Sequence, residues 1–348
     1  MTPRVVTFGE VMLRLKSPSY ERLLQSPFLE ATFGGGEANV AASLANFGVQ
    51  VDFVTALPPN AIGDACCAHL KGLGIGTSQI VRTGDRMGLY FLETGSNQRP
   101  ARVIYDRARS AFIEATPEAF AWERILEAAD WFHVTGITPA LSENTAGMAL
   151  AAVQAARKMG LTVSCDYNYR KNLWKYGRTA PQVMTDLVGY CDIGMANEED
   201  CQQALGISVD AEEVHRDVGS DHLDVQAYRT LTGKVLEAFP GLRKQAITLR
   251  ESYNADRNGW SACLHNRQEF LHSTRYEVLD VVDRVGTGDA FAAGLIFGWL
   301  SGGEDRDALE FAVAASCLKH TIPGDMNRCT VWEVEQLLRE GGSGRIKR

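Results

Sequence analysis

Short β-branched segments alternate with longer helical patterns along most of this 348-residue chain, and this alternation constrains its fold more than any other feature. We expect strands at residues 5–8, 51–55, 131–134, 162–166, 193–196 and 246–249. We expect helices at residues 37–47, 61–73, 143–159, 181–188, 198–205, 226–239, 289–300 and 305–320. The alternation predicts an α/β fold, in which helices cover both faces of a mostly parallel sheet. Ligands of such sheets bind beyond the carboxyl ends of the strands, so we expect the functional site there.

Two regions interrupt the alternation. Residues 12–36 carry few helix signals, and residues 86–112 include alternating apolar runs such as Leu89-Tyr90-Phe91-Leu92. Both patterns are typical of antiparallel strands, and together they predict a small sheet beside the core, in the position of a lid. The acidic segment 208–225 is expected to be an exposed insertion, and the Gly/Ser-rich basic end, 341–348, a flexible tail.

Charge and cysteine content narrow the class of protein. A net charge of −8 and a pI near 5.5 disfavour a nucleic-acid partner, so an anionic ligand would need a local cluster of Arg or Lys. None of the eight cysteines lies in a Cys-x-x-Cys pair, which favours reduced thiols. The N-terminal residues lack a signal-peptide pattern, and no apolar run has the length of a membrane span. We therefore expect a cytoplasmic protein with no membrane partner.

The segment Asp283–Gly294 joins an extended run, 276–282, to a helix of small apolar residues through a Gly-Thr-Gly turn. Such a turn presents free backbone N–H groups and the positive end of a helix dipole to an anion. A carboxylate, Asp289, follows in the same turn. This combination suits a phosphoryl group that gains negative charge while a base takes a proton from the attacking hydroxyl. Taken alone, the turn fits an ordinary Asp-capped helix equally well.

A second glycine-rich segment is Gly34-Gly35-Gly36-Glu37-Ala38-Asn39. Its glycines permit close approach of a ligand to the backbone, and Asn39 can bond ligand hydroxyls. The alternative is a flexible turn with Glu37 in the first turn of a helix. The phosphate loop Gly-x4-Gly-Lys-Ser/Thr and the dinucleotide pattern Gly-x-Gly-x-x-Gly are both absent, which weakens the two commonest explanations for nucleotide binding.

In this order, the two segments resemble the signatures of the PfkB, or ribokinase-like, carbohydrate kinase family, and the resemblance runs over nearly the whole chain. It implies a single kinase domain, 1–348, with a three-layer α/β/α core and a β-sheet lid inserted at about 12–36 and 86–112. The implied activity is ATP-dependent phosphorylation of a sugar hydroxyl, with Mg²⁺. By this resemblance Asp289 is the general base, and the backbone of Gly286, Thr287 and Gly288 forms the anion hole.

Three further segments, 87–91, 103–107 and 166–174, resemble those of 2-keto-3-deoxygluconate kinases. That resemblance implies substrate contacts from Gly34, Gly35, Asn39, Tyr90, Tyr105, Arg107, Arg170 and Asp289. The substrate carries a carboxylate, which suits a bidentate Arg, and Arg170 follows an expected strand end. Alternatives are a surface Arg170 paired with Asp166 or Asp186, tyrosines that only pack the lid, and a solvated Arg107.

Asn197-Glu198-Glu199-Asp200 is similar to the family's Asn-x-x-Glu motif, which helps to hold Mg²⁺ through water. Asp200 is one methylene shorter than Glu, a change that an outer-sphere role tolerates. The alternative is an acidic helix start. By the same resemblance, the nucleotide contacts are Asn197, Thr248, Arg250, Gly286, Gly288 and His320. The segment 319–325 is expected near the adenine or a monovalent cation such as K⁺, whereas Arg284 stands where the family more often has a small residue or Pro.

The expected reaction is therefore phosphorylation of 2-keto-3-deoxygluconate at its terminal hydroxyl, which gives the 6-phosphate. The sequence leaves open a kinase for the galactonate-derived keto acid, a fructokinase or ribokinase, and a catalytically inactive sugar-binding regulator. A nicotinamide dehydrogenase is disfavoured by the missing dinucleotide pattern. We also expect a homodimer formed through the lid, because a small exposed sheet has edges that need covering.

Overall fold

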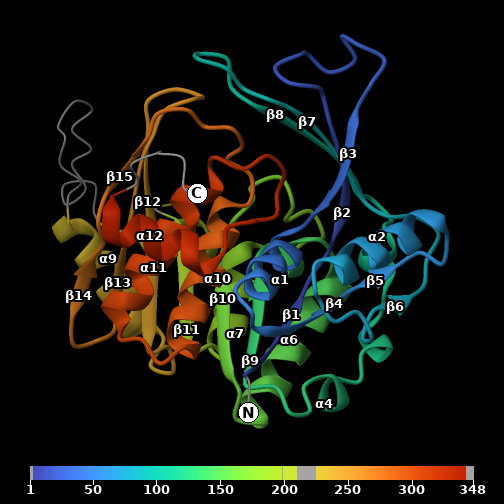
Figure 1. Cartoon of the computed structure of the whole chain (residues 1–348). Helices are drawn as coiled ribbons and strands as arrows, with labels where there is room; N and C mark the ends of the chain where they lie inside the picture. Colours follow the sequence, from blue (N-terminus) through green and yellow to red (C-terminus); the bar gives the residue numbers. More distant parts are fainter. Residues whose placement is uncertain (1–2, 198, 210–224, 342–348) are drawn as a thin grey trace.

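The computed structural model describes residues 3–197, 199–209 and 225–341. Its main sheet has nine strands in the order β14-β13-β12-β11-β10-β9-β1-β4, with β15 paired to β13 (Figure 1). The parallel strands are β1 (Arg4–Phe8), β4 (Gln50–Val54), β9 (Trp131–Thr135), β10 (Thr162–Asp166), β11 (Ile193–Asn197) and β12 (Lys244–Ser252). Five of the six predicted strands fall within one of these and the sixth, 51–55, extends one residue beyond the end of β4, so the predicted α/β fold is confirmed.

The strands β13 (Asn258–His265), β14 (Phe270–His272) and β15 (Tyr276–Val278) extend the sheet in antiparallel fashion beyond β12. Neither β13 nor β14 was among the predicted strands. An extended run was predicted over 276–282, but only its first three residues form a strand, β15.

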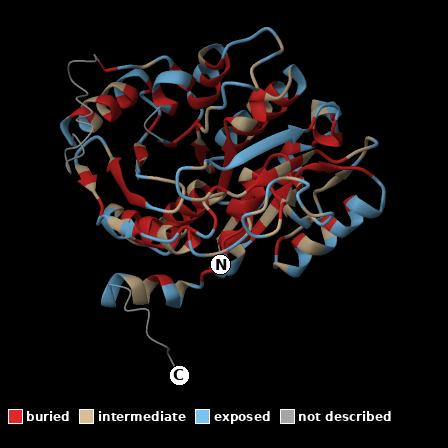
Figure 2. Ribbon diagram, turned by 90° about the horizontal axis from the view of Figure 1, so that it is seen from above, coloured by how far each residue is buried: buried red, intermediate tan, exposed pale blue. Residues whose placement is uncertain are grey.

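Helices cover both faces of the main sheet, because successive strand residues point to opposite sides. Val5, for example, belongs to one apolar cluster and Val6 to the other. The first cluster includes residues of α1 (Gly36–Asn46), α2 (Ala61–Gly72), α10 (Thr287–Leu300), α11 (Asp305–Lys319) and α12 (Val331–Glu340). The second includes residues of α3 (Ala111–Glu114), α4 (Trp122–Ile125), α6 (Glu143–Lys158), α7 (Ala180–Val188), α8 (Asp200–Leu205) and α9 (Val225–Ala238). Figure 2 shows the buried residues in the strands and on the inner sides of the helices.

Short elements connect these layers. They are β5 (Ala56–Leu57), β6 (Val81–Arg82), the 3-10 helix Pro117–Ala119 and α5 (Ile137–Ala140). None of the helices in the described part of the chain is both long and apolar enough to cross a bilayer. All eight cysteines are free thiols. The expected insertion falls mainly on 210–224 and the expected tail on 342–348, and these residues lie outside the described ranges.

A second, four-stranded sheet projects from one end of the core (Figure 1), and its order is β3-β2-β7-β8. Its strands are β2 (Met12–Lys16), β3 (Glu30–Gly34), β7 (Leu89–Glu93) and β8 (Arg102–Asp106). The predicted small sheet is therefore confirmed, with one correction: β2 and β7 are parallel, whereas the other two pairs are antiparallel. The chain passes through the core between β3 and β7, and a crossover of this kind allows the second strand to enter from the same end as the first.

Candidate active site

A cavity of about 520 Å³ lies at the carboxyl ends of β10 and β11, under the small sheet. It is the place where ligands of a parallel sheet are expected. The structure brings nearly all of the predicted site residues to its wall: Gly34, Gly35, Asn39, Tyr90, Tyr105, Arg107, Arg170, Asn197, Asp200, Thr248, Arg250, Gly286, Thr287, Gly288 and Asp289. Of the predicted residues, His320 alone is missing from this wall.

The Gly-Thr-Gly turn forms one end of the cavity. Gly286 is the N-cap of α10 and has a φ of 81°. A Cβ on Gly286 would lie 1.9 Å from the carbonyl oxygen of Asp325, so only glycine fits at this position. No side chain caps α10, and the first-turn N–H groups of a helix have no intrahelical acceptor. The turn therefore offers backbone donors to an anion in the cavity.

Asp289 lies in the first turn of α10 and faces α1. Its Oδ2 accepts a hydrogen bond of 2.7 Å from Nδ2 of Asn39, which joins the two glycine-rich segments. Burial raises the pKa of Asp289 to about 6, although the bond from Asn39 opposes that shift. A carboxylate with such a pKa is suited to accept a proton near neutral pH.

The N-terminus of α1 is held in place by a buried acid, Glu37, which was not among the predicted site residues. Oε1 of Glu37 accepts bonds from the backbone and hydroxyl of Thr135, both at 2.9 Å, and from the hydroxyl of Thr138 at 2.7 Å. Burial raises the pKa of Glu37 to about 7. In the sequence, Glu37 could be recognised only as an acidic residue in the first turn of a helix, which does not indicate burial. Gly35 is also fixed, because a Cβ there would lie 2.1 Å from the carbonyl oxygen of Glu10.

Arg170 is an exposed cation on the wall of the cavity. Its guanidinium donates to the carbonyl of Tyr169 at 2.8 Å, and it forms no ion pair with a carboxylate of the described residues. The alternative pairing with Asp166 or Asp186 is therefore not observed. Burial raises the pKa of Asp166 well above its usual value, neighbouring carboxylates add to this effect, and the charge of Arg170 opposes it. Arg170 thus keeps an available positive charge beside a group of acids.

Asp200 is tied to the backbone at the end of β11. Its two carboxylate oxygens accept bonds from the N–H groups of Tyr169 and Asn197, at 2.9 and 3.0 Å, and burial raises its pKa. Oδ1 of Asn197 accepts from the N–H of Asp200 at 3.0 Å. In the described residues no three acidic, His or Cys side chains are arranged to enclose a metal ion. These donors fit a hydrated Mg²⁺ that is also bound by substrate phosphates, and they do not fit an all-protein site.

The small sheet supplies the roof of the cavity. The rings of Tyr90 and Tyr105 lie 5.9 Å apart, and the hydroxyl of Tyr90 donates to Oδ2 of Asp325 at 2.5 Å. Arg107 is buried and donates from Nε to Oε2 of Glu10 at 2.8 Å, so it is not a solvated charge.

His320 is buried behind the cavity wall. Its ring packs edge-on against Trp260, with centroids 5.1 Å apart, and burial lowers its pKa to about 3. Trp260 itself lines the cavity, and the guanidinium of Arg250 lies over its ring at 5.2 Å. In the segment expected near K⁺, Nζ of the buried Lys319 donates to the carbonyls of Asp283 and Ile322, at 3.3 and 3.0 Å.

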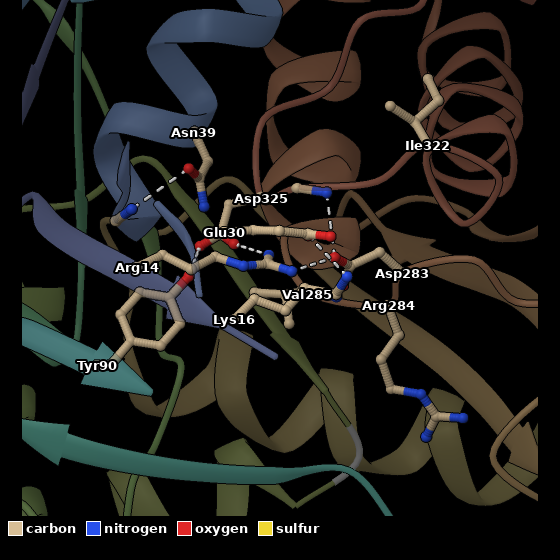
Figure 3. Close-up of polar contacts among 12 residues, drawn as sticks. Arg14, Lys16, Glu30, Asn39, Tyr90, Asp283, Arg284, Val285, Ile322 and Asp325 are labelled. Atoms are coloured by element: carbon tan, nitrogen blue, oxygen red, sulfur yellow. Dashed lines mark hydrogen bonds and ion pairs between the residues drawn. The ribbon is translucent and has the colours of Figure 1, made fainter. Parts of the chain in front are cut away.

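Arg284 has a structural explanation that its sequence position did not reveal. Its Nη2 donates to the carbonyls of Asn254 and Ala255, at 3.2 and 2.7 Å, and Figure 3 shows its side chain directed away from Asp283. The hairpin between β7 and β8 docks on the same turn, where the N–H of Ala255 donates to the carbonyl of Asn97 at 2.8 Å. Arg284 therefore braces the turn on which the small sheet rests. It also borders a second cavity of about 550 Å³ under this hairpin.

Comparison with known proteins shows the family to which the chain belongs. The model of the pfkB family of carbohydrate kinases matches residues 2–223 and 260–331. A 2-dehydro-3-deoxygalactonokinase of Haloferax volcanii is 32% identical over 346 residues, covering 99% of both chains. A 2-dehydro-3-deoxygluconokinase of Bacillus subtilis is 28% identical, covering 92% of this chain and 91% of the relative.

Among solved structures, the crystal structure of 2-dehydro-3-deoxygluconokinase from Thermotoga maritima superposes with a TM-score of 0.90. It is 45% identical, and the match covers 97% of this chain and 98% of that one. The matching family model, relatives similar over their full length and a cavity built from both glycine-rich signatures all point the same way: this chain belongs to the pfkB family of carbohydrate kinases.

Proposed function

We propose that this protein is a sugar-acid kinase that phosphorylates 2-keto-3-deoxygluconate at its terminal hydroxyl, with ATP as the phosphoryl donor. The observation that carries the proposal is Asp289. It is buried beside the uncapped N-terminus of α10, its pKa is raised to about 6, and Asn39 holds it at the wall of the cavity. A base and an anion hole therefore meet at one point, which is the arrangement that phosphoryl transfer to an alcohol requires.

The roles of the other residues follow from their places on the wall. Asp289 takes the proton of the terminal hydroxyl while the hydroxyl oxygen forms a bond to the γ-phosphorus of ATP. The bond between that phosphorus and the bridging oxygen breaks, and ADP leaves. The N–H groups of Gly286, Thr287 and Gly288 stabilise the charge that develops on the transferred group. Bound Mg²⁺ neutralises phosphate charge, and Asn197 and Asp200 would hold it through its water ligands.

The sugar acid lies under the small sheet in this proposal. Arg170 has no carboxylate partner among the described residues, so its guanidinium is available for the carboxylate of the substrate. Of the residues that line the cavity, Thr248 and Arg250 would contact the nucleotide, and the hydroxyls of the sugar acid would be surrounded by Gly34, Gly35, Asn39, Tyr90, Tyr105 and Arg107. The segments 12–36 and 86–112 then act as the lid of a single kinase domain.

The relatives support a sugar acid more strongly than a neutral sugar. Two proteins similar over almost their whole length are named for the galactonate-derived and gluconate-derived keto acids. The two substrates differ at one stereocentre, and no contact in the cavity can be assigned to it. The galactonate-derived acid is therefore the second candidate substrate.

A panel of substrates in an ADP-release assay tests the proposal. It should contain both keto acids, 5-dehydro-2-deoxygluconate, fructose and ribose, each with ATP and Mg²⁺. We expect kcat/KM for one of the 2-keto-3-deoxy acids to exceed that of either neutral sugar by at least about 100-fold, because a site built for a charged group rejects analogues that lack it. Equal or higher activity with fructose or ribose would overturn the sugar-acid assignment. No ADP release with any compound would favour a sugar-binding regulator.

A further inference from the structure

The small sheet places one charged side chain deep inside the molecule. Arg14, in the middle of β2, is 1% exposed and is not among the described residues that line the cavity. A guanidinium removed from water costs several kcal/mol unless its charge is paired. Arg14 is paired twice, since Nη2 lies 2.5 Å from Oδ2 of Asp283 and Nη1 bonds Oδ1 of Asp325. Figure 3 shows its guanidinium between the two carboxylates.

Each of these carboxylates also holds a part of the cavity. Oδ1 of Asp283 accepts from the N–H of Val285 at 3.0 Å, directly before the Gly-Thr-Gly turn, and Oδ2 accepts from the N–H of Gly324 at 3.1 Å. Asp325 supports the turn from behind, because its carbonyl oxygen lies where a Cβ of Gly286 would be. Its carboxylate bonds the hydroxyl of Tyr90. One guanidinium therefore joins the anion hole to the roof of the sugar pocket.

The charges in this cluster matter for the reaction. Burial disfavours the charge of Arg14, but the facing carboxylates of Asp325 and Asp283 outweigh burial and raise its pKa. Asp325 is also close enough to raise the pKa of Asp289. Without Arg14, the two buried carboxylates would lose their direct ionic partner, and only the charge of the nearby Lys319 would offset them behind a turn that must stabilise a negative phosphoryl group.

We propose that Arg14 is a positioning residue of phosphoryl transfer, which fixes the Gly286–Gly288 turn and Tyr90 in one arrangement through Asp283 and Asp325. Because Arg14 belongs to the small sheet and the turn to the core, the position of the sheet over the sugar is coupled to the shape of the anion hole. This inference rests on the proposed function, since it assigns Arg14 to the same transfer step. Arg14 touches neither substrate and acts only through its partners.

Arg14→Met and Arg14→Lys test this role with the substrate pair that the panel identifies. We expect Arg14→Met to lose at least about 100-fold in kcat, with KM for ATP changed less than about threefold, because a displaced turn loses most of its effect on the charge that develops only in the transition state. Arg14→Lys should recover part of that loss and remain about tenfold below the wild type, since an ammonium cannot bond both carboxylates as a fork does. If Arg14→Met does not fold, the Lys variant decides.

Arg4→Met is the matched control. Arg4 forms a similar ion pair, 2.7 Å from Oδ2 of Asp52, at the amino end of β1 far from the cavity. It should lower the melting temperature and leave kcat unchanged below the transition. Wild-type kcat in Arg14→Lys, or an equal loss in the Arg4 variant, would overturn the inference and leave the proposed function standing. If the wild-type protein is inactive with every compound of the panel, both the proposed function and the inference about Arg14 are wrong.

Discussion

At the residue scale, Asp289 combines a proposed catalytic role with a cost to stability. Burial raises its pKa from 3.8 to about 6. The folded protein therefore binds a proton more tightly than the unfolded chain does. This preference adds stability below about pH 3.8, and the added stability is lost as the pH rises through about 6. At pH 7 the Asp289 carboxylate is therefore a buried negative charge, whereas an asparagine at this position would be neutral.

We expect Asp289→Asn to be inactive and more stable at the same time. Loss of the base should lower kcat by about 1,000-fold, and the free energy of unfolding at pH 7 should rise by up to about 3 kcal/mol, the equivalent of the change in pKa. The stability gain should shrink towards pH 4. Urea unfolding at pH 4, 5.5 and 7, together with ADP release, checks both effects. Near wild-type kcat would remove Asp289 from the base role. A stability difference that does not change with pH would contradict the raised pKa.

The pH dependence of kcat/KM in the wild type should also depend on Asp289. Because the base must be deprotonated, kcat/KM should fall as the pH drops below about 6. A profile that stays flat down to pH 4.5 would be incompatible with this assignment.

In the proposed function, Arg170 is the residue that selects a substrate with a carboxylate. We expect Arg170→Ala to raise KM for the keto acid at least about tenfold, since a hydrogen bond to a charged group is lost, and to leave kcat for fructose or ribose unchanged. Arg178→Ala is the control, because Arg178 lies on the same segment, is 48% exposed and pairs weakly with Asp186 at 3.9 Å. If KM for the keto acid is unchanged in Arg170→Ala, then Arg170 does not bind the substrate carboxylate and this part of the proposal is wrong.

Residue-level patterns predicted some side chains and misplaced others. Asn39 and Asp289 stood out because each follows glycines at a helix start. Arg14 did not, because in Met-Leu-Arg-Leu-Lys it alternates with leucines and so falls on the apparent polar face of a strand. That face covers the cavity, and the partners of Arg14 are 269 and 311 residues away in the chain. A local pattern cannot reveal such a distant ion pair.

At the element scale, β-branched residues decided which strands could be predicted. The six parallel strands are largely buried, and five of them contain at least two such residues, whereas β11 contains only Ile193. By contrast, β13 reads Asn-Gly-Trp-Ser-Ala-Cys-Leu-His and contains no β-branched residue at all. It forms because β12 offers an edge for eight residue pairs. The parallel pairing of β2 with β7 also depends on the route through the core, which local sequence does not encode.

Glu37 links two elements, and its removal should loosen α1. We expect Glu37→Ala to lower the free energy of unfolding by about 2–4 kcal/mol, because the donors of Thr135 and Thr138 lose their buried acceptor. Asn39 shifts with the helix, so KM for the sugar acid should rise too. Glu37→Gln keeps an acceptor oxygen and should be at least as stable as the wild type at pH 8. Urea unfolding of both variants measures this, and equal stability of the Ala and Gln variants would contradict the link.

The pKa of Glu37 sets the pH at which this comparison is sharpest. Its folded-state pKa is raised from 4.5 to about 7, so its contribution to stability is complete below pH 4.5 and is lost as the pH rises through about 7. The Gln variant does not titrate. Its advantage over the wild type should therefore be larger at pH 8 than at pH 5.

At the scale of the whole molecule, the small sheet leaves an apolar outer face uncovered. Along β8, Val103 and Tyr105 line the cavity, so Ile104 between them points outward, where it is 55% exposed. Ile104 pairs with Phe91 of β7, and in the connection before β3 Phe28 is 71% exposed. A strand edge with exposed apolar residues invites another copy of the chain. We therefore propose that the protein is a dimer through the outer faces of its small sheets.

We expect the wild type to sediment as a dimer at micromolar concentration and Ile104→Glu to sediment as a monomer, because a buried unpaired carboxylate opposes association. Trp332→Glu, which places the same charge at a 54% exposed apolar residue of α12, should remain dimeric.

Because β8 carries Ile104 on one side and the cavity residues Val103 and Tyr105 on the other, loss of the partner should free the strand that roofs the sugar pocket. KM for the sugar acid should then rise in Ile104→Glu and, on dilution, in the wild type. A monomeric wild type, or a dimeric Ile104→Glu, would contradict this interface.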